Sequence, residues 1–234
     1  MGTRSIIAIA GDDRITFLQG ILTQDVTKLA AEKIQFAALL SPQGKILHDM
    51  FLIDDGERIL LDTQSAFSTI LLKRLAMYKL RAKVVIEELS PEAVAGIPSD
   101  LPDPRHPELP PYSPLAYHDT PLALGIPELG RDFAPDSVVA LDAGYDLLNA
   151  VSFTKGCYVG QEITARMHYK NIARRGFFIL TNDTMPTRLA LLKFEDVLGA
   201  PPHTVTVDNQ TFHARLPEWM APKFAQYQSA AEKQ

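Results

Sequence analysis

Apolar positions recur at helical and strand spacings through residues 5–90. Residues 12–22 begin with two aspartates and place apolar side chains on one helical face, which predicts a short helix. Residues 34–63 read as three short strands with turns at Ser-Pro-Gln-Gly and Asp-Asp-Gly, which predicts an antiparallel meander. Residues 65–81 carry apolar side chains at intervals of three and four, which predicts an amphipathic helix. Residues 83–89 follow as a further strand.

The pattern changes after residue 90, because eleven of the seventeen prolines fall between Pro91 and Pro135. This density excludes long helices and central strands, so we expect an ordered connector with short helical turns. Residues from Ala221 onward are polar and are expected to fray. Four further strands are predicted to form a small C-terminal β subdomain: residues 174–180, 189–197, 203–207 and 211–215.

The amino-acid composition and net charge exclude several classes of function. The chain is 46% hydrophobic and 22% charged, as in ordinary globular proteins, and its formal net charge of -5 gives no general attraction to nucleic acid or to an anionic membrane. No apolar run reaches the roughly 18 residues that span a bilayer, and the N-terminal stretch lacks a secretory signal pattern. One cysteine cannot form an internal disulfide. We therefore expect a soluble cytoplasmic protein with neither nucleic acid nor membrane as partner. No heptad or long edge strand predicts self-association, so a monomer is expected.

The single cysteine, Cys157, stands in the stretch SFTKGCYVGQEITAR, residues 152–166. A lone cysteine is often a small buried hydrophobe, but these neighbours are polar or conformationally special. Gly156 and Gly160 indicate a loop with positive φ or close backbone approach, and the following Gln-Glu pair suits the first turn of a helix. A thiol beside the Lys155 ammonium and a helix N-terminus has its thiolate stabilised, which favours a nucleophile or a metal ligand.

Three roles of Cys157 remain open from the residues alone. A catalytic nucleophile would need a base such as His48, His118 or His168, although no cysteine-protease spacing is present. A zinc site formed by this chain alone would need four ligands from the chain. A thiolate can instead supply part of an iron-sulfur ligand set when a second protein supplies the rest, and the scarcity of thiols favours this shared site.

Five basic residues and one acidic residue lie between Lys155 and Arg175. Such a run is either a solvated face or an anion contact, for example with a polyglutamylated cofactor tail or an acidic partner.

The stretch VSFTKGCYVGQEITAR resembles the signature of the YgfZ family, the folate-binding relatives of the glycine-cleavage T-protein. Three other stretches also resemble family segments, and the four cover residues 5 to about 180 in the expected order. They are ITFLQGILTQDVTKL (15–29), LLSPQGKILHDMFLI (39–53) and MYKLRAKVVI (77–86).

The resemblance implies an α+β fold with a GcvT/YgfZ-like folate-binding domain, residues 1–172, and a C-terminal β-barrel-like subdomain, residues 173–234. Only residues 181–187 separate FFIL (177–180) from RLALLKF (188–194), so this subdomain is expected to be shortened. Tetrahydrofolate is the implied cofactor, with Asp49 at the pterin edge and Arg81 or Arg166 at the glutamate tail. Further cofactor contacts are assigned to the signature itself: Lys155, Tyr158, Gly160, Gln161 and Glu162.

The function that the resemblance implies is assembly or repair of iron-sulfur clusters, with an A-type carrier protein and iron-sulfur client enzymes as partners. Cys157 would be the reactive thiol, or a ligand to a [2Fe-2S] cluster shared with the carrier. Two alternatives remain: a folate-dependent aminomethyl transferase and a ligand-free scaffold. Asp49 in an apolar strand argues against the scaffold, although an aspartate directed to solvent from an edge strand would look the same. The sequence leaves enzymatic turnover open.

Overall fold

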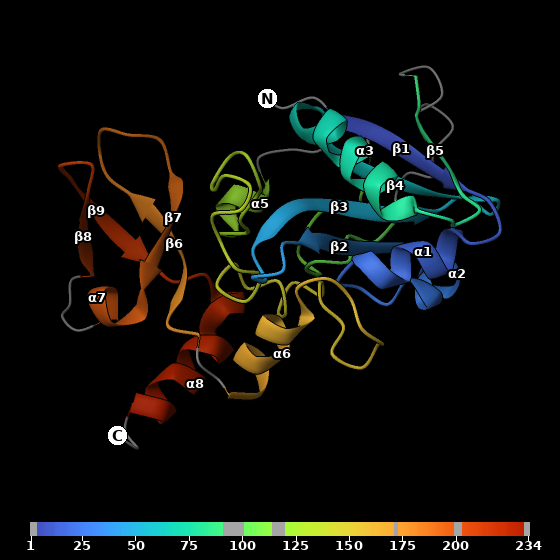
Figure 1. Cartoon of the computed structure of the whole chain (residues 1–234). Coiled ribbons are helices and arrows are strands. Elements are labelled where there is room, and N and C mark those ends of the chain that lie inside the picture. The colour runs from blue at the N-terminus through green and yellow to red at the C-terminus, as the bar shows by residue number, and fades with distance from the viewer. Residues whose placement is uncertain (1–3, 91–100, 114–119, 171–172, 199–202, 232–234) are drawn as a thin grey trace.

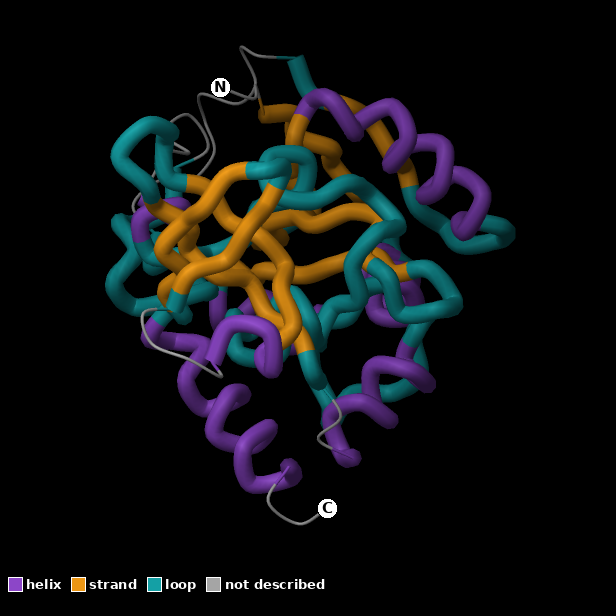
Figure 2. The backbone as a smooth tube through the Cα atoms, turned by 90° about the vertical axis from the view of Figure 1, so that its left-hand side faces the viewer, coloured by secondary structure: helices purple, strands orange, loops and turns teal. Residues whose placement is uncertain are grey.

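The computed structural model describes residues 4–90, 101–113, 120–170, 173–198 and 203–231 (Figure 1). It contains two antiparallel sheets. In Figure 2 the strands gather at the centre of the molecule and the helices lie around them.

The first sheet has five strands in the order β2-β3-β4-β1-β5. They are β1 (Arg4–Ala10), β2 (Ile34–Leu40), β3 (Ile46–Asp54), β4 (Arg58–Gln64) and β5 (Val85–Glu88). The predicted meander β2-β3-β4 and the strand β5 are confirmed. Strand β1 was not predicted, because its run Ile-Ile-Ala-Ile is buried on both faces and shows no alternation.

One face of this sheet is covered by helices. They are α1 (Arg14–Ile21), the 3-10 turn η1 (Val26–Lys28), α2 (Leu29–Glu32) and α3 (Ser65–Lys79). Both predicted helices are confirmed, with α3 crossing above β1 and β4 (Figure 1). The buried face of α1 differs from the prediction, since Ile15 is 39% exposed while Phe17 and Ile21 join the core.

The other face is covered by irregular chain between residues 101 and 160, in which α5 (Thr120–Ala123) is one short helical turn. This matches the expected connector, while residues 91–100 and 114–119 of the same stretch lie outside the described residues. The core on this face includes Phe36, Phe51, Tyr112 and Tyr145.

The second sheet is a curled half-barrel with strand order β7-β6-β9-β8. Its strands are β6 (Arg175–Thr181), β7 (Arg188–Lys193), β8 (Thr204–Val207) and β9 (Gln210–Arg215). Asp208 and Asn209 both have positive φ between β8 and β9, as a tight primed hairpin turn requires. The strand predicted over 189–197 ends at Lys193, because Phe194–Leu198 forms helix α7 and buries Phe194 and Val197.

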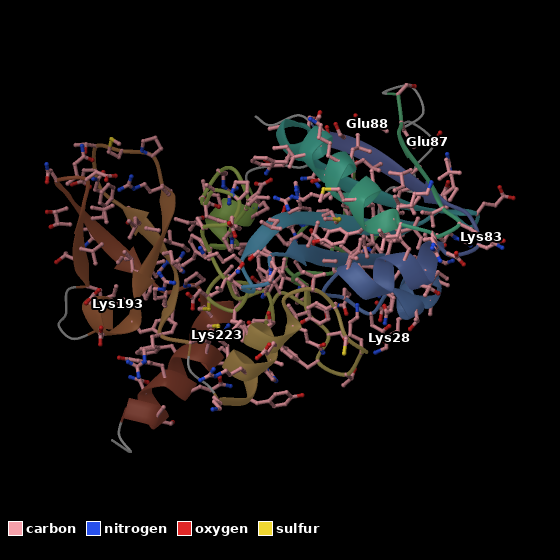
Figure 3. All side chains as sticks on the ribbon, viewed as in Figure 1. Lys28, Lys83, Glu87, Glu88, Lys193 and Lys223 are labelled. Carbon is pink, nitrogen blue, oxygen red and sulfur yellow. The ribbon has the colours of Figure 1, made fainter. Side chains whose placement is uncertain are left out.

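Residues 218–231 form regular structure, so the predicted fraying from Ala221 is wrong for the described residues. They form the turn η2 (Glu218–Met220) and helix α8 (Ala221–Ala231). Lys223 is 4% exposed, and its ammonium donates to the Leu141 carbonyl and to the Asp146 carboxylate. Figure 3 shows Lys223 where α8 meets the body of the protein. This long-range ion pair has no local sequence signal.

The two sheets share a core. Phe177 and Ile179 of β6 belong to the same buried cluster as Phe36 and Phe51, and the ring centroids of Phe133 and Phe177 lie 5.7 Å apart. The sheets on either side of the expected boundary at residue 172 are therefore packed together.

Candidate functional site

Cys157 is exposed in the loop that leads into helix α6 (Gln161–Lys170). The helix begins where the sequence predicted it. Glu162 and Arg166 are exposed on α6, and Gln161 is half-buried in its first turn.

The Lys155 side chain is buried beneath this loop. Its ammonium donates to the carbonyls of Gln19, Leu22 and Gln24 at 2.7, 2.7 and 2.9 Å, at the end of α1. An ammonium has three N–H donors, so all three are used. Burial lowers the pKa of Lys155 to about 8. Because its donors are committed to backbone carbonyls, none is left in this structure for a hydrogen bond to the thiol or to a cofactor. Stabilisation of the thiolate by the charge of Lys155, and contact with a cofactor, stay predictions.

Gly160 fixes the other end of the loop. Its φ is +82°, and a Cβ there would lie 2.5 Å from the Ser41 carbonyl oxygen and 2.9 Å from the Leu40 Cβ. Glycine is thus required both by conformation and by close approach to the β2–β3 turn. Gly156 has neither constraint, since its φ is not positive and a Cβ would meet no atom within 4 Å.

Three stretches that resemble the family therefore meet at this loop. Besides the Lys155 contacts, the Thr23 hydroxyl donates to the Ala150 carbonyl at 2.6 Å, and the Gln24 side-chain amide donates to the Asn149 carbonyl at 2.7 Å. Residues 19–24 are thus hydrogen-bonded to residues 149–155, and Leu40 and Ser41 approach Gly160 closely, so the three segments form one packed unit on which Cys157 is exposed. We call this unit the cysteine loop platform.

The remaining signature residues pack around the platform. Tyr158 is buried, and burial raises the pKa of its hydroxyl to about 12. Its ring lies 5.1 Å from the Lys155 ammonium. Phe153 stacks on His168 of α6 with ring centroids 3.6 Å apart, and Tyr169 beside them is 70% exposed.

Asp49 occupies a different place in the fold. It lies on β3, an interior strand, and is 6% exposed on the face opposite α3. Its carboxylate accepts a hydrogen bond from the Tyr145 hydroxyl at 2.6 Å and a longer one from the Leu129 amide at 3.4 Å. Burial raises the pKa of Asp49, opposed by the Tyr145 hydrogen bond. A solvent-directed aspartate on an edge strand is thereby excluded.

Several charged and aromatic side chains surround Asp49. Asp62 is bonded to the guanidinium of Arg4 at 2.8 Å and to the Tyr112 hydroxyl. Arg105 pairs with Asp103 and lies 4.8 Å from the centroid of Phe51.

Sequence reasoning missed Arg4, Arg105, Tyr112 and Tyr145, the partners of this cluster. They come from the unpredicted strand β1 and from the irregular chain, where no motif marks them.

The two arginines proposed for a folate tail lie apart from Asp49. Arg81 is exposed in the turn after α3, and α3 covers the face of the sheet opposite Asp49. Arg166 belongs to α6 beside the cysteine loop platform. The structure therefore does not bring the folate contacts predicted from the sequence into one site.

A pocket of about 370 Å³ opens between the irregular chain and the C-terminal segment. Small-molecule sites commonly have this size. Asp49 is not one of its lining residues. They are His106, Glu108, Ala123, Leu124, Arg215, Glu218 and Trp219.

Metal ligation by the chain alone finds no support in the described ranges, where no group of three or more His, Cys, Asp or Glu side chains is arranged to hold an ion. No helix in these ranges is both long and apolar enough to span a bilayer.

The human mitochondrial iron-sulfur cluster assembly factor IBA57 is 32% identical over 235 aligned residues, with 79% of this chain and 66% of the relative covered. The mouse protein is 29% identical, with 75% of this chain and 63% of the relative covered. The Neurospora crassa homologue is 26% identical, with 74% and 51% covered. Among solved structures, aminomethyltransferase T of the glycine cleavage system from Bartonella henselae matches 92% of this chain and 84% of its own, with a TM-score of 0.67 and 14% identity.

The chain belongs to the YgfZ/GcvT-like family. No protein-family model matches it. This YgfZ/GcvT-like chain spans about half to two thirds of the length of the three curated relatives described above. The likeness to aminomethyltransferase T confirms the predicted fold class. The expected cytoplasmic location is wrong, because these relatives are mitochondrial proteins.

Proposed function

We propose that this YgfZ/GcvT-like protein assists the assembly or repair of iron-sulfur clusters, and that Cys157 is the thiol that acts in it. The observation that carries the proposal is the exposed thiol on a loop fastened from both sides. Its relatives are named as iron-sulfur cluster assembly factors, which supports the same role here.

The cluster is shared with a second protein in this proposal. The irons of a [2Fe-2S] cluster need four protein ligands, commonly cysteine thiolates. The chain has one cysteine, and the described residues hold no group of three potential ligands. A cysteine-bearing A-type carrier supplies the other ligands, and the cluster is cargo that passes on to a client enzyme.

The test is anaerobic cluster reconstitution on a mixture of this protein with an A-type carrier, followed by visible absorption. Cys157→Ser changes little volume at an exposed position, so the fold is retained in far-UV dichroism while cluster absorbance falls to that of the carrier alone. A matched control combines Cys157→Ser with Thr154→Cys, which moves the thiol to another exposed position of the same loop. This control also fails if the position of the thiol matters. A folded Cys157→Ser protein that gives the wild-type cluster yield disproves the assignment.

We also propose that the protein binds a reduced folate with Asp49 at the pterin edge, as the sequence resemblance implies. A buried carboxyl next to aromatic rings suits the donors and flat face of a pterin. The 370 Å³ pocket, which Asp49 does not line, offers the Arg215 guanidinium to a glutamate tail and the Trp219 indole to an aromatic ring.

Trp219 is the single tryptophan, so its fluorescence reports on this pocket. Titration with tetrahydrofolate under reducing conditions is expected to quench it in the wild type. Asp49→Asn and Arg215→Ala each weaken binding about tenfold or more, from loss of a charge-assisted hydrogen bond. The exposed control Lys193→Ala, on the far end of the second sheet, has no effect. Saturable quenching of equal affinity in all four proteins would remove Asp49 and Arg215 from the site.

A further inference from the structure

Helix α3 is apolar on two sides, and the first sheet covers only one of them. Its inner side buries Leu71 and Leu75 against the sheet. On its outer side Ile70, Met77 and Leu80 are 50%, 75% and 87% exposed. Ile70 and Met77 stand two turns apart on one line of the helix, and Leu80 follows at its end. We call these three residues the outer stripe. The three side chains do not form a continuous patch, but they are strongly exposed for apolar residues and lie on one side of the helix.

Basic residues surround the outer stripe. Between residues 65 and 86 the chain holds five lysines and arginines and no acidic residue, although the whole chain has a net charge of -5. They are Lys73, Arg74, Lys79, Arg81 and Lys83, of which Arg74 is half-buried and acts on His48 of the sheet, so that its charge is directed inward. In the described part of the chain none of the five forms an ion pair, whereas Lys28, Lys33 and Lys193 do. The positive charge around the stripe is therefore uncompensated.

We propose that the outer stripe and its basic rim dock on an anionic lipid surface. Apolar side chains flanked by lysine and arginine supply the two signals that stable binding to such a surface needs. A second copy of this chain is disfavoured, because two stripes facing each other would bring two sets of five cations together. The three apolar side chains stand out separately from a convex helix, with Lys73 between Ile70 and Met77, and this suits a deformable layer of headgroups.

Acidic residues also lie near this surface: the Asp13 carboxylate accepts a hydrogen bond from the Lys83 amide at 2.7 Å, and Glu87 and Glu88 belong to β5. Glu87 and Glu88 are exposed there, as Figure 3 shows at the end of the sheet that also carries Lys83. Their side chains alternate between the two faces of the strand, so Glu88 shares the face of Ile86 and α3 while Glu87 lies on the opposite face. The balance on the α3 side stays positive.

The test is co-sedimentation of the full chain with vesicles of phosphatidylcholine alone and of phosphatidylcholine mixed with phosphatidylserine. The wild type is expected to bind the mixed vesicles at least about tenfold more tightly, and salt weakens this binding. Met77→Glu with Leu80→Glu removes the apolar contacts and adds two repelling charges, which lowers binding to the level of neutral vesicles. The charge-matched control is Ile15→Glu with Met185→Glu, two exposed sites outside the stripe, and it keeps the wild-type binding.

Two results overturn the proposal. Equal and weak sedimentation of the wild type with both vesicles rejects a lipid surface and leaves an acidic protein as the occupant of the stripe. If the Met77→Glu, Leu80→Glu variant and the charge-matched control lose binding equally, net charge alone governs binding to the vesicles. The outcome does not depend on Cys157, so it separates from the test of cluster assembly.

Discussion

The two glycines of the signature provide a sharp test of the cysteine loop platform, because they share a loop and differ in environment. Gly160→Ala places a Cβ 2.5 Å from the Ser41 carbonyl oxygen, a backbone atom that cannot move aside cheaply, at a φ of +82°. The left-handed conformation costs a non-glycine residue roughly 1–2 kcal/mol, and overpacking costs roughly 1–3 kcal/mol. Reduced freedom of the unfolded chain returns about 0.4–1 kcal/mol. The expected loss of stability is therefore about 2–4 kcal/mol.

Gly156→Ala is the matched substitution. Its φ is not positive and its Cβ meets nothing within 4 Å, so we expect a change within about 0.5 kcal/mol of zero. Urea unfolding followed by Trp219 fluorescence and far-UV dichroism measures both variants. With a slope of about 3 kcal/mol/M, the midpoint of Gly160→Ala falls by roughly 1 M. Midpoints for the two variants that agree within error would refute the close contact between Gly160 and the β2–β3 turn.

Three other predictions concern buried basic side chains. Lys155→Met leaves the carbonyls of Gln19, Leu22 and Gln24 without their donor, so it costs about 2–4 kcal/mol in urea unfolding; an unchanged unfolding midpoint would contradict a fastened loop. Lys223→Met leaves the Asp146 carboxylate unpaired and lowers the free energy of unfolding by about 3 kcal/mol in thermal or urea unfolding. The Lys28 side chain is 57% exposed, so Lys28→Met is expected to change the free energy of unfolding by no more than about 0.5 kcal/mol. Burial lowers the pKa of His48 from 6.5 to about 4. As the pH falls, the His48 imidazole is therefore protonated below about pH 6.5 in the unfolded chain but only near pH 4 in the folded chain. The corresponding stability is complete above pH 6.5 and is lost toward pH 4, and the wild type should lose about 3 kcal/mol more than His48→Leu over that range; parallel pH profiles would contradict it.

Elements with an amphipathic pattern, or with recognisable turns at their ends, could be predicted from the sequence. Helix α3 was found from its inner residues Leu71 and Leu75, and the meander from its turns. Strand β1 and helix α8 could not be predicted in this way. A short strand buried on both faces has no period-two pattern, and α8 is held by Lys223 against a loop far away in the sequence.

The candidate site was likewise only partly predictable from the sequence. The sequence located the loop of Cys157 and the start of α6, since glycines and a helix N-terminus leave local signals. It could not place Tyr145 on Asp49 or Arg105 on Phe51, because those contacts join segments more than fifty residues apart. It also placed Arg81 with Asp49, while the fold puts them on opposite sides of one sheet.

These contacts show that the residues of the signature KGCYVGQE have different structural roles. Lys155 uses all of its donors on the end of α1, Tyr158 is buried, and Gly160 meets the β2–β3 turn. These residues hold the loop in place, and the side chains of Lys155 and Tyr158 are buried. Cys157 is exposed in this arrangement, together with Gly156 and Glu162. A thiol needed only for packing would not be exposed, and a loop needed only as a connector would not be fastened to two other segments. The arrangement therefore favours contact between the thiol and a second molecule over a structural role.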